Sequence, residues 1–294
     1  MDVGEAGAGD AGSGDAEWGE EPEVTSVWLR RGVDVTVAHP ARRYDYWLGG
    51  KDNFPADRES GDAVAAAFPT IRTAVVENRR FLGRAVRFLA EDAGIDQFLD
   101  IGTGIPAADN THEVAQRIVP SSRVVYVDND PIVLAHARAL LTSTHADGAT
   151  AYIDADLRDP AKILADPALP GTLDLSRPVA LMLLAVLHFV FDEHRPYDLV
   201  GRLVDSLAPG SYLVMSHTTN DLMSAETRAK VEAVTASQGG YQPRTRAEFA
   251  RFFEGFDLVE PGLVPITDWR ADGEPPPRPT AADVGMYGAV ARLR

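Results

Sequence analysis

The residues best suited to chemistry begin with the run DIGTG (100–104), which ends a strand-like stretch and opens a turn. Gly102 and Gly104 let the backbone turn tightly and approach a ligand without interference from a Cβ atom. A second strand-like stretch ends at Asp128, 24 residues beyond Gly104. A carboxylate at that place can accept both hydroxyl protons of a ribose.

A third strand-like stretch is followed by Asp156 and Leu157, a carboxylate beside an apolar side chain. The pair suits an adenine ring, because the acid can accept from the amino group while the apolar residue contacts the ring. The carboxyl ends of parallel strands meet at one edge of an α/β sheet, where ligands bind. The three motifs together predict a site for a cofactor that carries adenosine.

Two classes of adenosine cofactor fit this spacing. Gly102, Gly104 and Ala107 satisfy the dinucleotide pattern G-x-G-x-x-G/A, which expects an acid about 20 residues further on. Pro106 removes a backbone N–H from the turn that would hold a pyrophosphate, and Asp100 would repel one. S-adenosylmethionine instead carries a positive sulfur and an ammonium group, which this carboxylate would attract. The electrostatics therefore favour S-adenosylmethionine.

The elements that must position these motifs alternate between strands and helices. Strand-like stretches fall at 97–101, 123–128, 149–154, 178–190, 211–216, 256–266 and 286–293. Helices are expected between them, with Asn110, Asp130 and Asp159 as N-caps, and a longer helix over 71–93 precedes the first strand. This order predicts an α/β fold with a mostly parallel sheet, an antiparallel last strand and helices on both faces. Residues 40–70 show no period and are interpreted as irregular.

Composition narrows the class of protein. The chain has 294 residues, a net charge of −16 and no cysteine, which excludes disulfides and thiolate metal sites. The acidic balance argues against general nucleic-acid binding and against attachment to anionic membranes. No apolar run could span a bilayer and no signal peptide is visible, so we expect a cytoplasmic protein. Residues 1–36 are expected to form a disordered acidic tail, since their first 23 residues include eight carboxylates and no lysine or arginine.

These motifs resemble those of class I S-adenosylmethionine-dependent methyltransferases. Longer stretches resemble one actinobacterial family of such enzymes, formerly classed as a domain of unknown function: RRYDYWLGGKDNFPADR (42–58), FLDIGTGIPAADNTHEVAQ (98–116) and VVYVDNDPIVLAHARALL (124–141). The resemblance implies a seven-stranded, Rossmann-like methyltransferase domain over 37–294 with an N-terminal helical cap over 37–75. It implies no particular methyl acceptor. The sequence departs from the wider class at Pro106-Ala107, where a third glycine is common.

The resemblance also implies roles for individual residues. Gly102 and Gly104 would lie under the methionine part of S-adenosylmethionine, Asp128 would hold the ribose, and Asp156 and Leu157 would flank the adenine. The other expected cofactor contacts are Asp100, Thr103, Asn129 and Tyr46.

The carboxylate of the cofactor needs a cation or backbone donors. Arg79, on the helix before the first strand, is the main candidate, with Arg72 and Arg43 as rivals; a surface ion pair is the alternative for each. An aromatic face in the cap could also attract the sulfonium, with packing inside the cap as the alternative. The aromatic residues in question are Tyr44, Tyr46 and Trp47.

A general base is needed only if the acceptor is a hydroxyl or a protonated amine. His188 and His217 follow the fourth and fifth strands, and we take His188 as the candidate base, although each histidine could simply cap its strand. Tyr241 and Asp52 are weaker candidates. The histidine spacing gives no reason to expect a metal site.

Three hypotheses remain open at this stage. The first is a methyltransferase acting on a small molecule, because the chain lacks both a basic balance and an Asn-Pro-Pro-aromatic tetrad after the fourth strand, where it reads LAVL (184–187). The second is a methyltransferase-like module that binds the cofactor without catalysis. The third is a nicotinamide-dependent oxidoreductase. The oligomeric state stays open.

Overall fold

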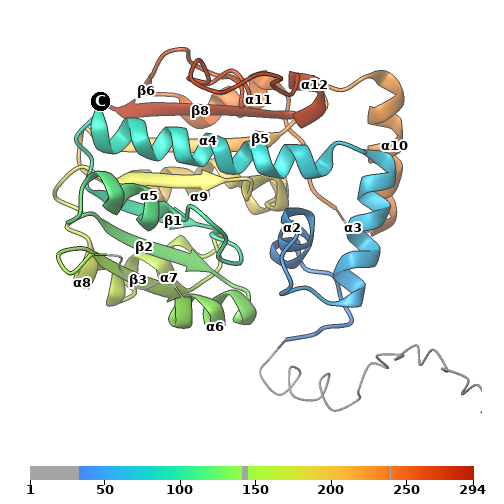
Figure 1. Ribbon diagram of the computed structural model, residues 1–294. Coiled ribbons are helices and arrows are strands. Elements are labelled where there is room, and N and C mark those ends of the chain that lie inside the picture. Colours follow the sequence, from blue (N-terminus) through green and yellow to red (C-terminus); the bar gives the residue numbers. More distant parts are fainter. Residues whose placement is uncertain (1–32, 141–144, 239) are drawn as a thin grey trace, which may run out of the picture.

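A single mixed sheet carries the fold, and the strands lie in the order β3-β2-β1-β4-β5-β8-β6, with β7 paired to β8 (Figure 1). This computed structural model describes residues 33–140, 145–238 and 240–294. The expected acidic tail therefore lies, up to residue 32, outside the described residues.

The first five strands run parallel to one another, and β8 runs antiparallel to β5. The antiparallel last strand and the α/β fold are confirmed. The strand bounds are β1 Gln97–Ile101, β2 Arg123–Asp128, β3 Ala149–Asp154, β4 Ala180–Leu184, β5 Tyr212–Thr218, β6 Phe256–Leu258, β7 Val264–Pro265 and β8 Met286–Leu293.

Two strand predictions were too long. The stretch 256–266 is divided into β6 and β7, because a turn that includes Gly262 at φ +86° interrupts it. The run 178–190 ends as a strand at Leu184, where Ala185 adopts φ +51° and the chain enters the short 3₁₀ helix η1, Leu187–Phe189. The sheet consequently has one strand more than expected, and His188 lies in a 3₁₀ turn.

Helices cover both faces of the sheet (Figure 1). One core lies between α4, α5 and the sheet, and the other lies beneath α7, α8, α9 and α11. The α-helix bounds are α2 Pro40–Leu48, α3 Pro55–Ala67, α4 Ile71–Glu91, α5 Thr111–Ile118, α6 Pro131–Leu140, α7 Pro160–Ala165, α8 Ala168–Thr172, α9 Pro196–Val204, α10 Ala225–Gln238, α11 Arg246–Ala250 and α12 Ala281–Val284. Within the described residues, no helix combines the length and apolarity needed to cross a membrane.

Local sequence explains where several of these helices begin. Asn110 and Glu113 form the expected capping box of α5, and Asp159 accepts from the backbone N–H of Lys162 at the start of α7. Asp130 accepts from Ile132 N at 2.8 Å at the start of α6. Each cap begins the helix that follows β1, β2 or β3 along the chain, after the loop that carries the residues predicted to bind the cofactor.

Residues 40–70 are not irregular, as their lack of period had indicated. They form the helices α2 and α3, which lie beyond the carboxyl ends of β1 and β4 (Figure 1). The pattern is hidden because both helices mix charged residues among apolar ones and are held by specific side-chain contacts. Just before them, Val33 and Val35 are buried in a small cluster with Ile132 of α6.

Candidate functional site

The two glycines of the turn after β1 have different surroundings. Gly102 has φ +76°, and a Cβ atom there would lie 2.4 Å from Cγ2 of Val186, so the turn packs directly against the chain after β4. Gly104 has φ +70°, and no atom lies within 4 Å of the place a Cβ would take. The Thr103 hydroxyl donates to the Asp100 carbonyl at 3.0 Å and so braces the turn. Open space therefore lies over Gly104.

Asp100 is a buried carboxylate with little to stabilise its charge. It is 5% exposed, and its Oδ2 accepts from the Thr111 hydroxyl at 2.6 Å. Burial raises the pKa of Asp100 to about 6; the Asp128 charge also raises it, while Thr111 and the Arg79 charge oppose the shift. Such a carboxylate favours a cationic ligand, because a nearby positive charge would offset the energetic cost of burying the negative charge.

Asp128 ends β2 beside this turn. Its Oδ2 accepts from Gly104 N at 2.8 Å and its Oδ1 accepts from Asp130 N at 3.0 Å. Burial raises the pKa of Asp128, although these two hydrogen bonds act against the shift. Each carboxylate oxygen keeps a further lone pair, so the side chain can still accept from a ligand.

Asn129 and Asp156 join the ends of β2 and β3. The Asn129 amide donates to Asp156 Oδ2 at 2.9 Å, and Asp156 Oδ1 accepts from Arg158 N and Nε at 2.8 and 2.9 Å. Leu157 is 6% exposed and belongs to the core beneath α7. The structure thus brings Asn129 and Asp156 together, while Leu157 can reach a ligand only through the small edge that remains exposed.

The three candidate arginines separate in space. Arg79 Nη2 donates to the carbonyls of Ala108 and Asp109 at 2.8 and 2.9 Å, and its charge acts on Asp100. Its Nε is buried and has no hydrogen-bond partner among the described residues. The Arg72 guanidinium lies 5.0 Å from the centre of the Tyr46 ring, and Arg43 Nη1 donates to the Ser60 hydroxyl at 3.1 Å.

The aromatic residues of α2 make contacts within the cap itself. The Tyr46 hydroxyl donates to Asp62 at 2.7 Å, and a Cβ added to Gly61 would lie 2.8 Å from its ring. Trp47 Nε1 donates to the Gly61 carbonyl at 3.2 Å. With Arg72 also over its ring, Tyr46 makes packing contacts of the kind given as the alternative, and its contact with the cofactor stays a prediction.

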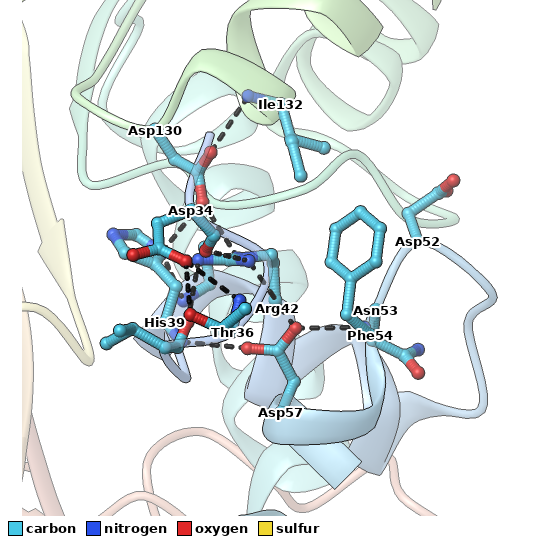
Figure 2. Close-up of polar contacts among 12 residues, drawn as sticks. Asp34, Thr36, His39, Arg42, Asp52, Asn53, Phe54, Asp57, Asp130 and Ile132 are labelled. Carbon is cyan, nitrogen blue, oxygen red and sulfur yellow. Dashed lines mark hydrogen bonds and ion pairs between the residues drawn. The ribbon is translucent and has the colours of Figure 1, made fainter. Parts of the chain in front are cut away.

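A buried charge cluster fastens the cap to the loop after β2. Figure 2 shows Arg42 between Asp57 of α3 and Asp130, with His39 beside Asp130. Arg42 is 5% exposed; its Nε lies 3.5 Å from Asp130 Oδ2 and its Nη1 lies 3.7 Å from Asp57 Oδ2. His39 Nδ1 lies 2.8 Å from Asp130 Oδ2. Since Asp130 N also binds Asp128, the cap is connected to the expected ribose ligand.

Sequence reasoning missed this cluster. Asp130 was assigned only as an N-cap, and nothing in the spacing of His39, Arg42 and Asp57 pairs them with a residue some 90 positions away. Asp52, a weak candidate base, lies 3.2 Å from His136 Nε2 and takes part in a second contact between the cap and α6.

His188 follows β4 as expected, whereas His217 lies within β5 and does not follow it, because β5 extends to Thr218. Both rings are buried, but their nitrogens have different partners. His217 Nε2 accepts from Arg244 at 2.9 Å, because a guanidinium can only donate, and Nδ1 therefore donates to the Thr218 carbonyl at 2.8 Å. Burial lowers the pKa of His217 to about 4. With its lone pair occupied, His217 is not available as a base.

His188 keeps a free nitrogen. It is 6% exposed, and its Nδ1 is buried without a hydrogen-bond partner among the described residues. Burial lowers its pKa well below the ordinary value, so the ring is neutral at physiological pH. Arg244, which the sequence did not single out, donates to the carbonyls of Leu187 and Val190 at 3.0 Å each and fixes the turn that carries His188.

Comparison with known proteins decides the family. A family model described as S-adenosyl methyltransferase matches residues 26–294. The chain belongs to the S-adenosyl methyltransferase family. S-adenosylmethionine is its cofactor, and none of these findings supports a nicotinamide-dependent oxidoreductase. Among curated proteins, no sequence matches.

Two actinobacterial structures are similar over almost the whole chain. A DUF574 family protein from Streptomyces avermitilis is 49% identical with a TM-score of 0.83, and the match covers 89% of this chain and 99% of that one. A candidate methyltransferase from Thermobifida fusca is 41% identical with a TM-score of 0.81, covering 91% and 99%. The class I methyltransferase fold expected from the sequence is confirmed.

The residues at the strand ends fit this methyltransferase cofactor. Gly104 leaves open space, Asp100 is a buried carboxylate whose pKa is raised, and Arg79 Nε lacks an acceptor among the described residues. These are the complements of a methionine chain that carries an ammonium group, a sulfonium and a carboxylate.

The two glycines should respond differently to alanine. Gly102→Ala should destabilise the fold, because it adds the clash with Val186 to a left-handed backbone cost of about 1–2 kcal/mol. Gly104→Ala should cause only the backbone cost, yet weaken S-adenosylmethionine binding about tenfold or more, because its methyl group enters the ligand space. Thermal unfolding and calorimetric titration measure the two effects. A Gly104→Ala protein with wild-type affinity would refute the position assigned to this turn.

Asp100→Asn should stabilise the free protein at neutral pH. The folded-state pKa of about 6 lies above the ordinary 3.8, so ionised Asp100 destabilises the fold increasingly as pH rises from 3.8 to 6. The gap corresponds to about 3 kcal/mol that asparagine avoids. Denaturant unfolding of both proteins between pH 4 and pH 8 measures the difference in stability. A difference that does not change with pH would contradict the assignment.

Proposed function

We propose that this methyltransferase acts on a small molecule enclosed between the cap and the ends of β1 and β4. The observation that carries the proposal is the enclosure itself. Asp100, Asp128 and His188 are at most 8% exposed, and the cap over them is fastened through Arg42 and Asp130. A macromolecular acceptor would need an open surface at this edge, and the net charge of −16 disfavours nucleic acid.

The cofactor roles proposed here follow the strand ends. Asp128 with Asn129 would hold the ribose, Asp156 the adenine, and Asp100 the ammonium group of the methionine part. Arg79 Nε would donate a hydrogen bond to the cofactor's carboxylate. Thr103 acts through the backbone, since its hydroxyl is used inside the turn.

His188 would serve as the general base where the acceptor is protonated. When bound, S-adenosylmethionine supplies a methyl group already activated by a positive sulfur. The chain therefore has to align the acceptor, exclude water and remove a proton. Neutral His188, with its free Nδ1 and a turn fixed by Arg244, is placed to take that proton.

The proposed organisation of the chain keeps the catalytic domain at residues 37–294, with the cap segment at 37–75 and an acidic tail at 1–36. The end of that tail packs on the domain, since Val33 and Val35 are buried against Ile132. The contacts of His39 and Arg42 with Asp130 support the cap as a part of the domain. The methyl acceptor would have to enter before or while the cap closes.

Titration calorimetry with S-adenosylmethionine, S-adenosylhomocysteine and NAD tests the cofactor site. Asp128→Ala should weaken the first two ligands about tenfold to a hundredfold, since it removes charged hydrogen bonds of about 1.5–3 kcal/mol. Asp154→Ala is the matched control, because Asp154 lies beside Asp128 in the sheet register and is exposed. Equal losses in both variants would contradict the role of Asp128, and binding of NAD alone would overturn the cofactor site. Cofactor binding without turnover of any acceptor would favour the non-catalytic module.

A further inference from the structure

Two buried polar atoms remain unsatisfied on the acceptor side of the site. Arg43 Nε in the cap and His188 Nδ1 after β4 are both buried and have no hydrogen-bond partner among the described residues. Buried polar groups normally have a hydrogen-bond partner, so a ligand that binds there would supply the partner that each atom lacks. Arg43 offers a donor with a positive charge, and neutral His188 offers an acceptor.

A buried hydrogen-bond chain ties the helix that carries Arg43 to the turn that carries His188. The Tyr44 hydroxyl accepts from the Asn78 amide at 3.0 Å, and Asn78 Oδ1 accepts from the Ser216 hydroxyl at 2.6 Å. Ser216 Oγ in turn accepts from Ala185 N at 3.0 Å, at the residue where β4 turns towards His188. Cap and strand end are thus held in one arrangement.

Charge divides the site into two halves. On the cofactor side, the acids Asp100 and Asp128 lie at the ends of β1 and β2, and Arg79 acts on Asp100. On the acceptor side, the nearby charges are those of Arg43 and Arg244, and both act on His188. Arg244 is already fully engaged with backbone carbonyls, His217 and Asp192. Of the two described arginines whose charges act on His188, Arg43 is therefore the one left to meet a ligand.

We propose that Arg43 and His188 form an acceptor subsite for an acidic oxygen, that of a phenol or a carboxylic acid. This inference rests on the proposed function and specifies its substrate class. A positively charged amine would be repelled by Arg43, whereas an oxyanion would satisfy its Nε. The subsite makes the enzyme an O-methyltransferase.

The reaction balances with the groups present. For a phenol, the hydroxyl proton moves to His188 Nδ1 and the oxygen pair forms the new bond to the methyl carbon. The carbon–sulfur bond breaks and its electron pair stays on sulfur, which becomes a neutral thioether. A carboxylic acid that binds already ionised needs no base, and Arg43 alone would orient it. His188→Gln therefore separates the two substrates.

The test uses the protein loaded with S-adenosylhomocysteine and three probes that share a para-nitrophenyl ring and differ in the group opposite the nitro group. They are para-nitrophenol, para-nitrobenzoate and para-nitrobenzylamine. Bound nitrophenol should ionise more than free nitrophenol at the same pH, which its visible absorbance reports. Arg43→Gln should weaken both acidic probes about tenfold or more, because a charged hydrogen bond is lost. Arg43→Lys should restore part of the affinity. Arg58→Gln, which changes an exposed arginine of the same cap, should have no effect.

Acidic probes that bind the loaded protein and are lost in Arg43→Gln, with S-adenosylhomocysteine affinity unchanged, would support the subsite. Preference for the amine, absence of binding by either acidic probe, or equal binding in Arg43→Gln would overturn it and leave the proposed function intact. Failure of the wild-type protein to bind S-adenosylhomocysteine would instead refute the proposed function itself.

Discussion

The carboxylate of Asp100 is buried at the end of β1 with a single hydroxyl donor, that of Thr111, and with Asp128 nearby. A charge in this setting destabilises the free protein unless it takes up a proton, which is why its pKa lies near 6. The elements around Asp100 keep its carboxylate buried. The glycine turn packs against Val186, and Arg79 is hydrogen-bonded to the loop after the turn. The site is in this sense prepared for a cationic ligand, and affinity is gained at the expense of stability.

The cap is a polar construction, and this determines how the site is enclosed. Arg42 reaches two carboxylates and two backbone carbonyls, so its burial depends on every one of these partners. The cluster joins the cap to Asp130, while the Tyr44–Asn78–Ser216 chain joins it to the end of β4. One attachment lies at the loop after β2 and the other at the end of β4. The two together fix the position of the cap over both strand ends.

Sequence alone predicted the elements whose signals are local. The bounds of β1, β2, β3 and β8 follow from alternation or apolar runs. The cap at Asn110 follows from Glu113 three positions on, and the cap at Asp159 follows from the adjacent Pro160. The residue pattern of 40–70 did not reveal the cap helices, which only the family resemblance implied, because they acquire their order from distant partners. The end of β4 escaped because an apolar run does not reveal where a backbone turns, as it does at Ala185. The roles of Arg42 and Arg244 could not be predicted either, because their main partners, Asp130 and His217, lie far along the chain.

The most direct test of this account is the pH dependence of S-adenosylmethionine binding. In the free protein Asp100 is protonated below about pH 6, and a cationic ligand requires it ionised, so binding must release a proton there. Calorimetric affinity should be flat above that pH and fall below it by up to about tenfold per pH unit. The same titration on Asp100→Asn should show weaker binding with this pH dependence removed. An unchanged pH dependence in Asp100→Asn would contradict the central role given to this carboxylate.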